Sequence, residues 1–308
     1  MPFICQHLFV GVPILFLGIQ YKDFININLN KMENLETPKK IETKFERLKN
    51  FLETHKNSIA MVFHRHAEHT NDKTQPDEFR RLAIETDIDK TIEAAGLIDF
   101  DLTVAYSVKS LRSFLTAYYL LKPNDSISLD QESQILQYEA IHSGPMKNKI
   151  RSKKELDYKD PTKFSFFEEL TKAFNENKML EFLVHHSDEY VAKGEDISAY
   201  TVVAKDIAKI AQTYIRFIPR WKNLSTSKFN NKNLFRTFCA REMVYGCFRA
   251  KITELVSGIE ERDSFVKYYD KNLSQKDIGV IIIKDQENLV LFDGFGQLSF
   301  TSSILEKI

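Results

Sequence analysis

Two short apolar runs constrain the fold of this 308-residue chain most strongly: SIAMVF at 58–63 and LTVAYS at 102–107. Both runs contain the β-branched and aromatic residues that favour buried strands. A helical pattern follows each run, at 77–96 and at 110–121. Strands that alternate with helices predict an α/β fold, a three-layer α/β/α arrangement around a mostly parallel central sheet.

Other patterns predict the remaining elements. They are a charged amphipathic helix at 40–57, a third extended segment made of SISL (126–129) and ILQYE (135–139), long helices at about 164–192 and 197–219, a strand at 233–240 that runs into a helix ending at Gly258, and a C-terminal hairpin of two strands. We therefore expect one α/β domain at 32–308 that carries a mostly helical insertion at about 147–232.

Residues 1–31 form an apolar N-terminal extension with three open interpretations. No Lys or Arg precedes the apolar stretch of residues 1–20 and no small-residue cleavage site follows it, so it does not fit a signal peptide. Gln6, His7 and Pro13 interrupt it, so it falls short of the roughly 20 apolar residues that a spanning helix needs. The extension is an upstream continuation of the reading frame before Met32, a membrane anchor or a packed helix.

The charge balance limits the partners of the chain. Lys plus Arg and Asp plus Glu are 43 each, so no long-range field attracts nucleic acid or an acidic membrane, and selectivity for anions must come from a local cluster. We expect no nucleic-acid partner, and membrane contact only if residues 1–20 are a true anchor. Cys5, Cys239 and Cys247 form no ligand or disulfide pattern, which favours a reducing, cytoplasmic location.

The stretch MVFHRHAEHT, residues 61–70, places three histidines and an arginine directly behind the first apolar run. His64, His66 and His69, with Glu68 in an acidic position, fit a zinc cluster like that of the metallo-β-lactamase fold, which this segment alone resembles. A surface loop with some histidines is the second interpretation. The carboxyl end of a buried strand is, however, where open α/β sheets bind ligands.

The third interpretation is phosphoryl transfer through Arg65 and His66. An imidazole can attack phosphorus and carry the phosphoryl group as phosphohistidine. The reaction needs guanidinium groups that bind the nonbridging oxygens and an acid that protonates the leaving oxygen.

Three motifs in order resemble the histidine phosphatase superfamily, which contains the cofactor-dependent phosphoglycerate mutases. FHRHAE resembles its R-H-[GA]-E signature. YSVKSLRSFLTA resembles its second motif, with Ser107, Arg112, Ser113, Thr116 and Ala117 in register. LQYEAIHSG resembles its L-x-x-E-x-x-x-x-G stretch, with Glu139 at the acidic position. The resemblance covers about 58–146.

This resemblance implies that His66 accepts the phosphoryl group, that Arg65 and Arg112 bind its oxygens, and that Glu139 donates the proton. His69 and Glu68 would lie at the substrate rim. The implied partner is a small phosphorylated substrate, and no metal or cofactor is implied.

The second catalytic histidine of the family has no counterpart here. Its place in NLFRTFCAREMVYGCFR falls on Arg241, and an alternative register in GVIIIKDQ places Lys284 there. Arginine can bind a phosphoryl group by charge and hydrogen bonds. Three functions therefore stay open: a phosphomonoester hydrolase, a catalytically degenerate protein that binds a phosphate ligand or a partner, and a zinc-dependent hydrolase.

Overall fold

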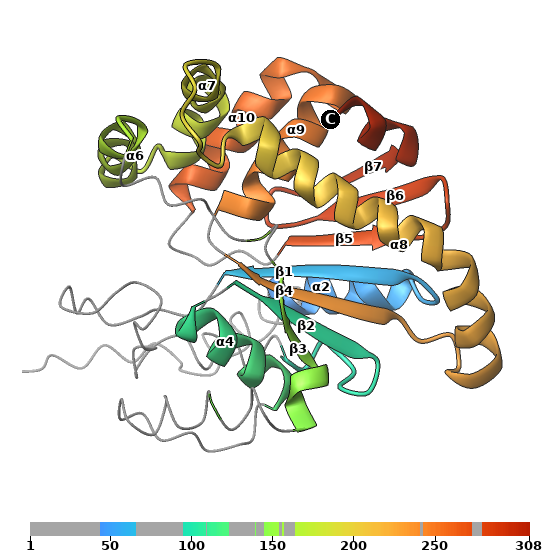
Figure 1. Cartoon of the computed structure of the whole chain (residues 1–308). Coiled ribbons are helices and arrows are strands. Elements are labelled where there is room, and N and C mark those ends of the chain that lie inside the picture. The colour runs from blue at the N-terminus through green and yellow to red at the C-terminus, as the bar shows by residue number, and fades with distance from the viewer. Residues whose placement is uncertain are drawn as a thin grey trace, which may run out of the picture. The chain divides into compact units, whose positions relative to one another are not determined.

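The computed structural model describes residues 44–65, 95–108, 110–122, 139, 145–153, 156, 164–240, 243–272 and 279–308, all within the unit Thr43–Ile308. These residues contain a sheet with the strand order β3-β2-β4-β1-β5-β6-β7 (Figure 1). Its strands are β1 (Ile59–Arg65), β2 (Thr103–Ser107), β3 (Ile150–Ser152), β4 (Leu234–Ala240), β5 (Gly279–Ile283), β6 (Asn288–Phe292) and β7 (Gln297–Thr301).

The sheet has a parallel half and an antiparallel half. β3, β2, β4 and β1 are parallel neighbours, whereas β5 runs antiparallel to β1 and the chain continues antiparallel through β6 and β7. The predicted parallel sheet is confirmed for the part that contains both apolar runs. Because β4 lies between β1 and β2, the carboxyl ends of these three strands meet at one edge.

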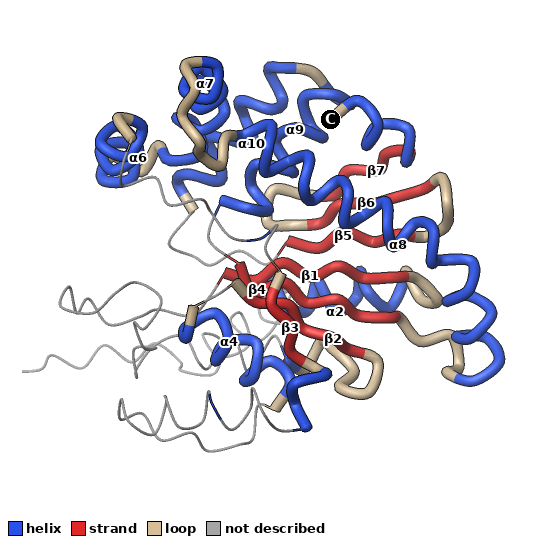
Figure 2. The backbone as a smooth tube through the Cα atoms, in the orientation of Figure 1, coloured by secondary structure: helices blue, strands red, loops and turns tan. Residues whose placement is uncertain are grey.

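Helices cover both faces of the sheet (Figure 2). Successive residues of a strand point to opposite faces, and in β1 Ile59, Met61 and Phe63 belong to one apolar cluster while Ala60 and Val62 belong to another. The first cluster includes α8 (Tyr200–Lys228) and α9 (Met243–Ser257), and the second includes α2 (Lys44–Thr54) and α4 (Leu111–Leu121). The predicted three-layer α/β/α architecture is confirmed.

The helical insertion differs in detail from the prediction. The expected helix at 164–192 is two helices, α6 (Phe166–Asn175) and α7 (Met179–Ala192). Asn177 between them has φ 55°, a left-handed conformation that ends α6. Asp270 then caps α7, because its carboxylate accepts hydrogen bonds from the backbone N–H groups of Leu180 and Glu181 at 2.8 and 2.9 Å.

Two further predictions of secondary structure are wrong, and one helix was missed. α8 does not end at 219 but continues through Pro219 to Lys228, since Ile218, Trp221 and Ser225 keep the helix buried against the core. A helix that the sequence analysis missed, α10, spans Ile259–Lys271. The C-terminal segment forms three strands instead of two, because a turn that begins at Asp293 leads from β6 into β7. The short helix η5 (Ser302–Lys307) follows β7.

The third extended segment was also misplaced. Glu139, the described residue of ILQYE, is helical, and the rest of SISL and ILQYE lies outside the described residues. The strand that pairs with β2 is β3, which follows the short helix η2 (Pro145–Asn148) inside the segment at about 147–232 that was expected to be a mostly helical insertion. Of the helix expected at 77–96, Ala95 is helical and residues 77–94 are not described.

Among the described helices, none combines the length and the apolar character that crossing a bilayer requires. The N-terminal extension, residues 1–31, lies outside the described part of the chain.

Candidate active site

The candidate site is built on the edge where β1, β4 and β2 end. The register pairs Arg65, the last residue of β1, with Ala240, the last residue of β4. One step earlier, Cys239 lies between His64 of β1 and Ser107 of β2. Adjacent parallel strands that end together form the kind of edge at which α/β proteins bind ligands.

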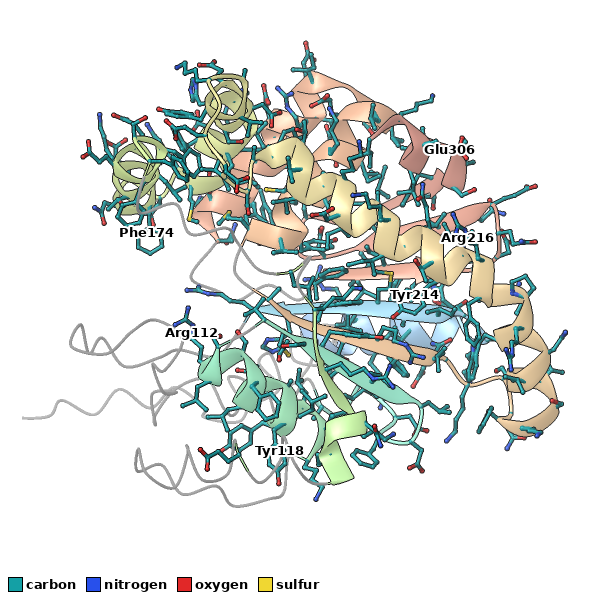
Figure 3. The ribbon with its side chains drawn as sticks, viewed as in Figure 1. Arg112, Tyr118, Phe174, Tyr214, Arg216 and Glu306 are labelled. Carbon is teal, nitrogen blue, oxygen red and sulfur yellow. The ribbon has the colours of Figure 1, made fainter. Side chains whose placement is uncertain are left out.

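Arg112 occupies the first turn of α4, the helix that follows β2. Ser110 caps this helix: its Oγ accepts a hydrogen bond from the Ser113 N–H at 3.4 Å and donates one to Ser113 Oγ at 2.9 Å. Arg112 is only 4% exposed, and Figure 3 shows it at the end of α4 where the helix begins. A cation at a helix N-terminus opposes the helix dipole, so a buried arginine there suits a site that holds anions.

The two residues at the end of β1 point to different faces of the sheet. Arg65 is two residues after Phe63, so it faces the same side of the sheet, the side that α8 covers, and it is partly exposed. His64 faces the other side of the sheet and is buried, and its Nδ1 forms a hydrogen bond with the backbone oxygen of Arg65. A metal at His64 would therefore have to bind Nε2.

Several predicted site residues lie outside the described part of the chain: His66, Glu68, His69 and Arg241. In sequence, His66 follows Arg65 directly and Arg241 follows Ala240 directly. Glu139 is described and its side chain is exposed.

The alternative register for the fourth motif, with Lys284, is wrong. Lys284 follows β5, which is antiparallel to β1 and pairs Ile283 with Ile59 at the start of β1. Lys284 therefore lies at the opposite edge of the sheet from Arg65.

The zinc and thiol alternatives concern residues that the structure describes only in part, since His66, Glu68 and His69 lie outside the described chain. The described residues contain no group of three or more His, Cys, Asp or Glu side chains that could hold a metal ion. His185 and His186, the other two neighbouring histidines of the sequence, lie on α7 and contact Asp263 and Glu189 at 3.7 and 3.8 Å. Burial raises the pKa of the Cys239 thiol, so it stays protonated and is a poor nucleophile.

An aromatic ladder that the sequence analysis missed lies directly behind the edge. Phe63, Phe238 and Tyr106 are register partners on β1, β4 and β2, with ring centroids 4.8 and 5.2 Å apart. Tyr245 of α9 continues the ladder, 5.6 Å from Phe63. The sequence contained a signal for this ladder, because each of the three strand residues is aromatic and lies one or two positions before the end of its strand. The ladder fixes the spacing of the three strand ends.

A cavity of about 680 Å³ lies elsewhere, near the start of β4. Its walls come from α2, the segment before β2 and the α8–β4 turn, and they include Lys49, Lys56 and Lys232. Lys232 is paired with Asp99 at 2.7 Å. None of the predicted site residues lines this cavity.

These observations define the class of protein as a three-layer α/β protein with basic residues at the carboxyl edge of its parallel strands. The sequence matches no protein-family model and no curated protein. Among solved structures, the chain is similar to a phosphoglycerate mutase from Bacillus anthracis, with 13% identity and a TM-score of 0.37, covering 83% of this chain and 98% of that one.

Two mycobacterial proteins are similar at the same level. A glucosyl-3-phosphoglycerate phosphatase has 11% identity and a TM-score of 0.38, covering 79% of this chain and 97% of the other. A protein described as mycobacterial hydrolase 1 has 11% identity and a TM-score of 0.41, covering 77% and 97%. At such TM-scores these similarities carry no argument about function, which must come from the residues of this chain.

Proposed function

We propose that this protein is a phosphomonoester hydrolase that acts through a phosphohistidine at His66. The observation that carries the proposal is the pairing of Arg65 with Ala240 at the ends of two adjacent parallel strands. Because His66 follows the first of these residues and Arg241 follows the second, the nucleophile and an anion-binding arginine would come from neighbouring strands. The buried Arg112 supplies a further cation at the start of α4.

In the proposed reaction the His66 imidazole attacks phosphorus and the P–O bond to the leaving alcohol breaks. Glu139 protonates the departing oxygen and then, as a carboxylate, takes a proton from the water that hydrolyses the phosphohistidine. Arg65, Arg112 and Arg241 bind the nonbridging oxygens throughout, since these oxygens keep their charge in the transition state.

The presence of arginine at 241, where the family has histidine, favours a second candidate function. Arginine, like histidine, can bind phosphate. Its longer side chain places the charge differently, however, and a displacement of about 1 Å can cost on the order of 100-fold in rate. The second candidate is a protein that binds a phosphorylated ligand at this edge of the sheet without turnover.

The test is hydrolysis of p-nitrophenyl phosphate by the full chain in the presence of a chelator. We expect slow turnover that is lost in His66→Ala and retained in His186→Ala, a change at an exposed histidine of α7. A radiolabelled phosphoenzyme should be acid-labile and absent from His66→Ala. Activity that the chelator removes and zinc restores would support the zinc hydrolase instead.

Phosphate affinity separates the two main candidates. Binding of phosphate or vanadate by the wild-type chain without any turnover would favour the degenerate protein. Under either candidate Arg241→Ala should weaken phosphate binding, and under the hydrolase Arg241→His should raise the rate. Unchanged phosphate affinity in Arg241→Ala would refute the assignment of Arg241.

A further inference from the structure

Helix α8 is unusually basic for a chain whose charges balance. The whole sequence has 43 basic and 43 acidic residues, whereas within α8 the only acidic residue is Asp206. The basic residues of this helix are Lys205, Lys209, Arg216, Arg220, Lys222 and Lys228. The local cluster of cations that a neutral chain needs for selecting anions is therefore present on α8.

Four of these cations form a stripe along one side of the helix, which we call the α8 stripe: Lys205, Lys209, Arg216 and Arg220. At 3.6 residues per turn, they fall within a sector of about 60° and extend over about 22 Å of the helix axis. All four are exposed. Figure 3 shows Arg216 and Tyr214 on different sides of α8, and Tyr214 bonds with Tyr106 of the sheet at 3.1 Å.

The charge of the α8 stripe is little compensated. Asp206 pairs with Lys209 at 3.0 Å, but Lys205, Arg216 and Arg220 form no ion pair with any residue that the structure describes. Lys222 lies on another side of the helix. Burial raises the pKa of Asp285, but hydrogen bonds from Glu287 and Asn288, and to the smallest extent the charge of Lys222, lower it below its usual value. Like charges four residues apart destabilise a helix, and the stripe contains two such pairs.

We propose that the α8 stripe docks on the surface of an anionic lipid bilayer. Gln212 and Thr213, which lie between Lys209 and Arg216, are polar and uncharged, so the middle of the stripe offers no apolar side chain to a peptide. It also lacks the aromatic side chains on which nucleic-acid bases stack, since Tyr214, Phe217 and Trp221 lie on other sides of α8. A planar row of cations fits the distributed charge of a bilayer.

The expected binding is weak and reversible. Each cation near an anionic membrane surface contributes about fivefold to binding, and stable attachment takes a second signal beside a basic patch. The chain has a candidate for that signal in its sequence, the apolar stretch of residues 1–20. The reason to choose a lipid surface over other anions is the α8 stripe itself, whose charge is spread over about 22 Å of the helix axis.

The experiment is co-sedimentation of the full chain with vesicles of phosphatidylcholine alone and of phosphatidylcholine with about one-third phosphatidylserine. We expect binding to the anionic vesicles that weakens with added salt. Arg216→Gln combined with Arg220→Gln should lower the partition coefficient about 25-fold, two charges at about fivefold each. The matched control, Lys172→Gln with Lys267→Gln on α6 and α10, removes two exposed charges and should change it less than twofold.

Thermal unfolding followed by circular dichroism checks that both double variants fold. The proposal is overturned if the wild-type chain ignores anionic vesicles, if both double variants bind equally well, or if the chain binds a DNA duplex through the stripe and vesicles not at all. Equal binding to neutral and anionic vesicles, through residues 1–20 alone, would also overturn it.

Discussion

The Tyr245 hydroxyl donates a hydrogen bond of 2.8 Å to Oδ2 of Asp293, which joins α9 to the turn between β6 and β7. The same oxygen accepts a bond from Nε of Arg249 at 3.1 Å, and the other carboxylate oxygen accepts bonds from the N–H groups of Phe295 and Gly296. All three side chains are buried. Burial and the adjacent Asp293 charge raise the pKa of Tyr245, so it remains a neutral donor.

We expect Asp293→Ala to lower the free energy of unfolding by about 3–5 kcal/mol, because it leaves the Arg249 guanidinium buried without its counter-charge. Tyr245→Phe removes one hydrogen bond and should cost about 1–2 kcal/mol. Denaturant unfolding measures both. Equal losses in the two variants would contradict a charge-compensating role for Asp293.

Gly279 is the position where β5 makes room for the Tyr245 ring. A Cβ added at Gly279 would lie 2.3 Å from Cζ of Tyr245, far inside contact distance. Gly279→Ala should therefore cost about 1–3 kcal/mol of stability through overpacking.

A double-mutant cycle isolates this clash. In a Tyr245→Ala background the same Gly279→Ala change should cost less than about 0.5 kcal/mol, since the ring is gone. If the cost of Gly279→Ala is the same in both backgrounds, its origin is not the ring.

Arg112 is the described cation that the proposed reaction depends on most. Arg112→Lys keeps the charge but loses the planar, two-pronged donor, so kcat/KM for an aryl phosphate should fall by about tenfold or more. Lys284→Ala is the control, because that lysine lies at the other edge of the sheet and should leave kcat/KM unchanged. A drop in the control as large as that in Arg112→Lys would refute the choice of edge.

Glu254 makes stability depend on pH. Burial raises its pKa, but bonds from Lys251 at 2.7 Å and Arg262 at 2.8 Å outweigh that effect and lower it below the usual value of 4.5. A carboxyl whose pKa is lower in the folded state stabilises the fold above its unfolded pKa and loses this contribution as the pH falls through the folded pKa.

Glu254→Gln should therefore lower the unfolding temperature at neutral pH and lower it progressively less in acid. Thermal unfolding at pH values from about 7 down to about 3 measures the difference. A gap between the two proteins that widens on acidification would contradict this sign.

The parts of the fold that the sequence predicts well are those with local signals. β1, β2 and β4 are apolar runs, and α4 begins at the Ser110 cap, so composition and capping define them within a residue or two. The division of α6 from α7 depends on Asn177 in a left-handed conformation and on a cap from Asp270, which lies about 90 residues away in sequence. No local pattern contains that contact.

Strand order is the other limit, and it matters for the site. GVIII of β5 is as apolar as β1, and the sequence alone allowed Lys284 to follow a parallel strand. Only the pairing of Ile283 with Ile59 shows that β5 is antiparallel and that its final residue lies at the far edge. The position of Arg65 beside the end of β4 could be expected from the motif order, whereas the in-register aromatic rings behind it required the strand pairing.

Cys239 lies between His64 and Ser107 in the centre of the parallel half, completely buried, and Cys247 is equally buried on α9. Alkylating reagents act on the thiolate, and Cys239 cannot meet the reagent while β4 remains paired with β1 and β2. In a Cys5→Ser, Cys247→Ser background, the labelling rate of Cys239 would thus report how often the strands that carry the proposed site separate.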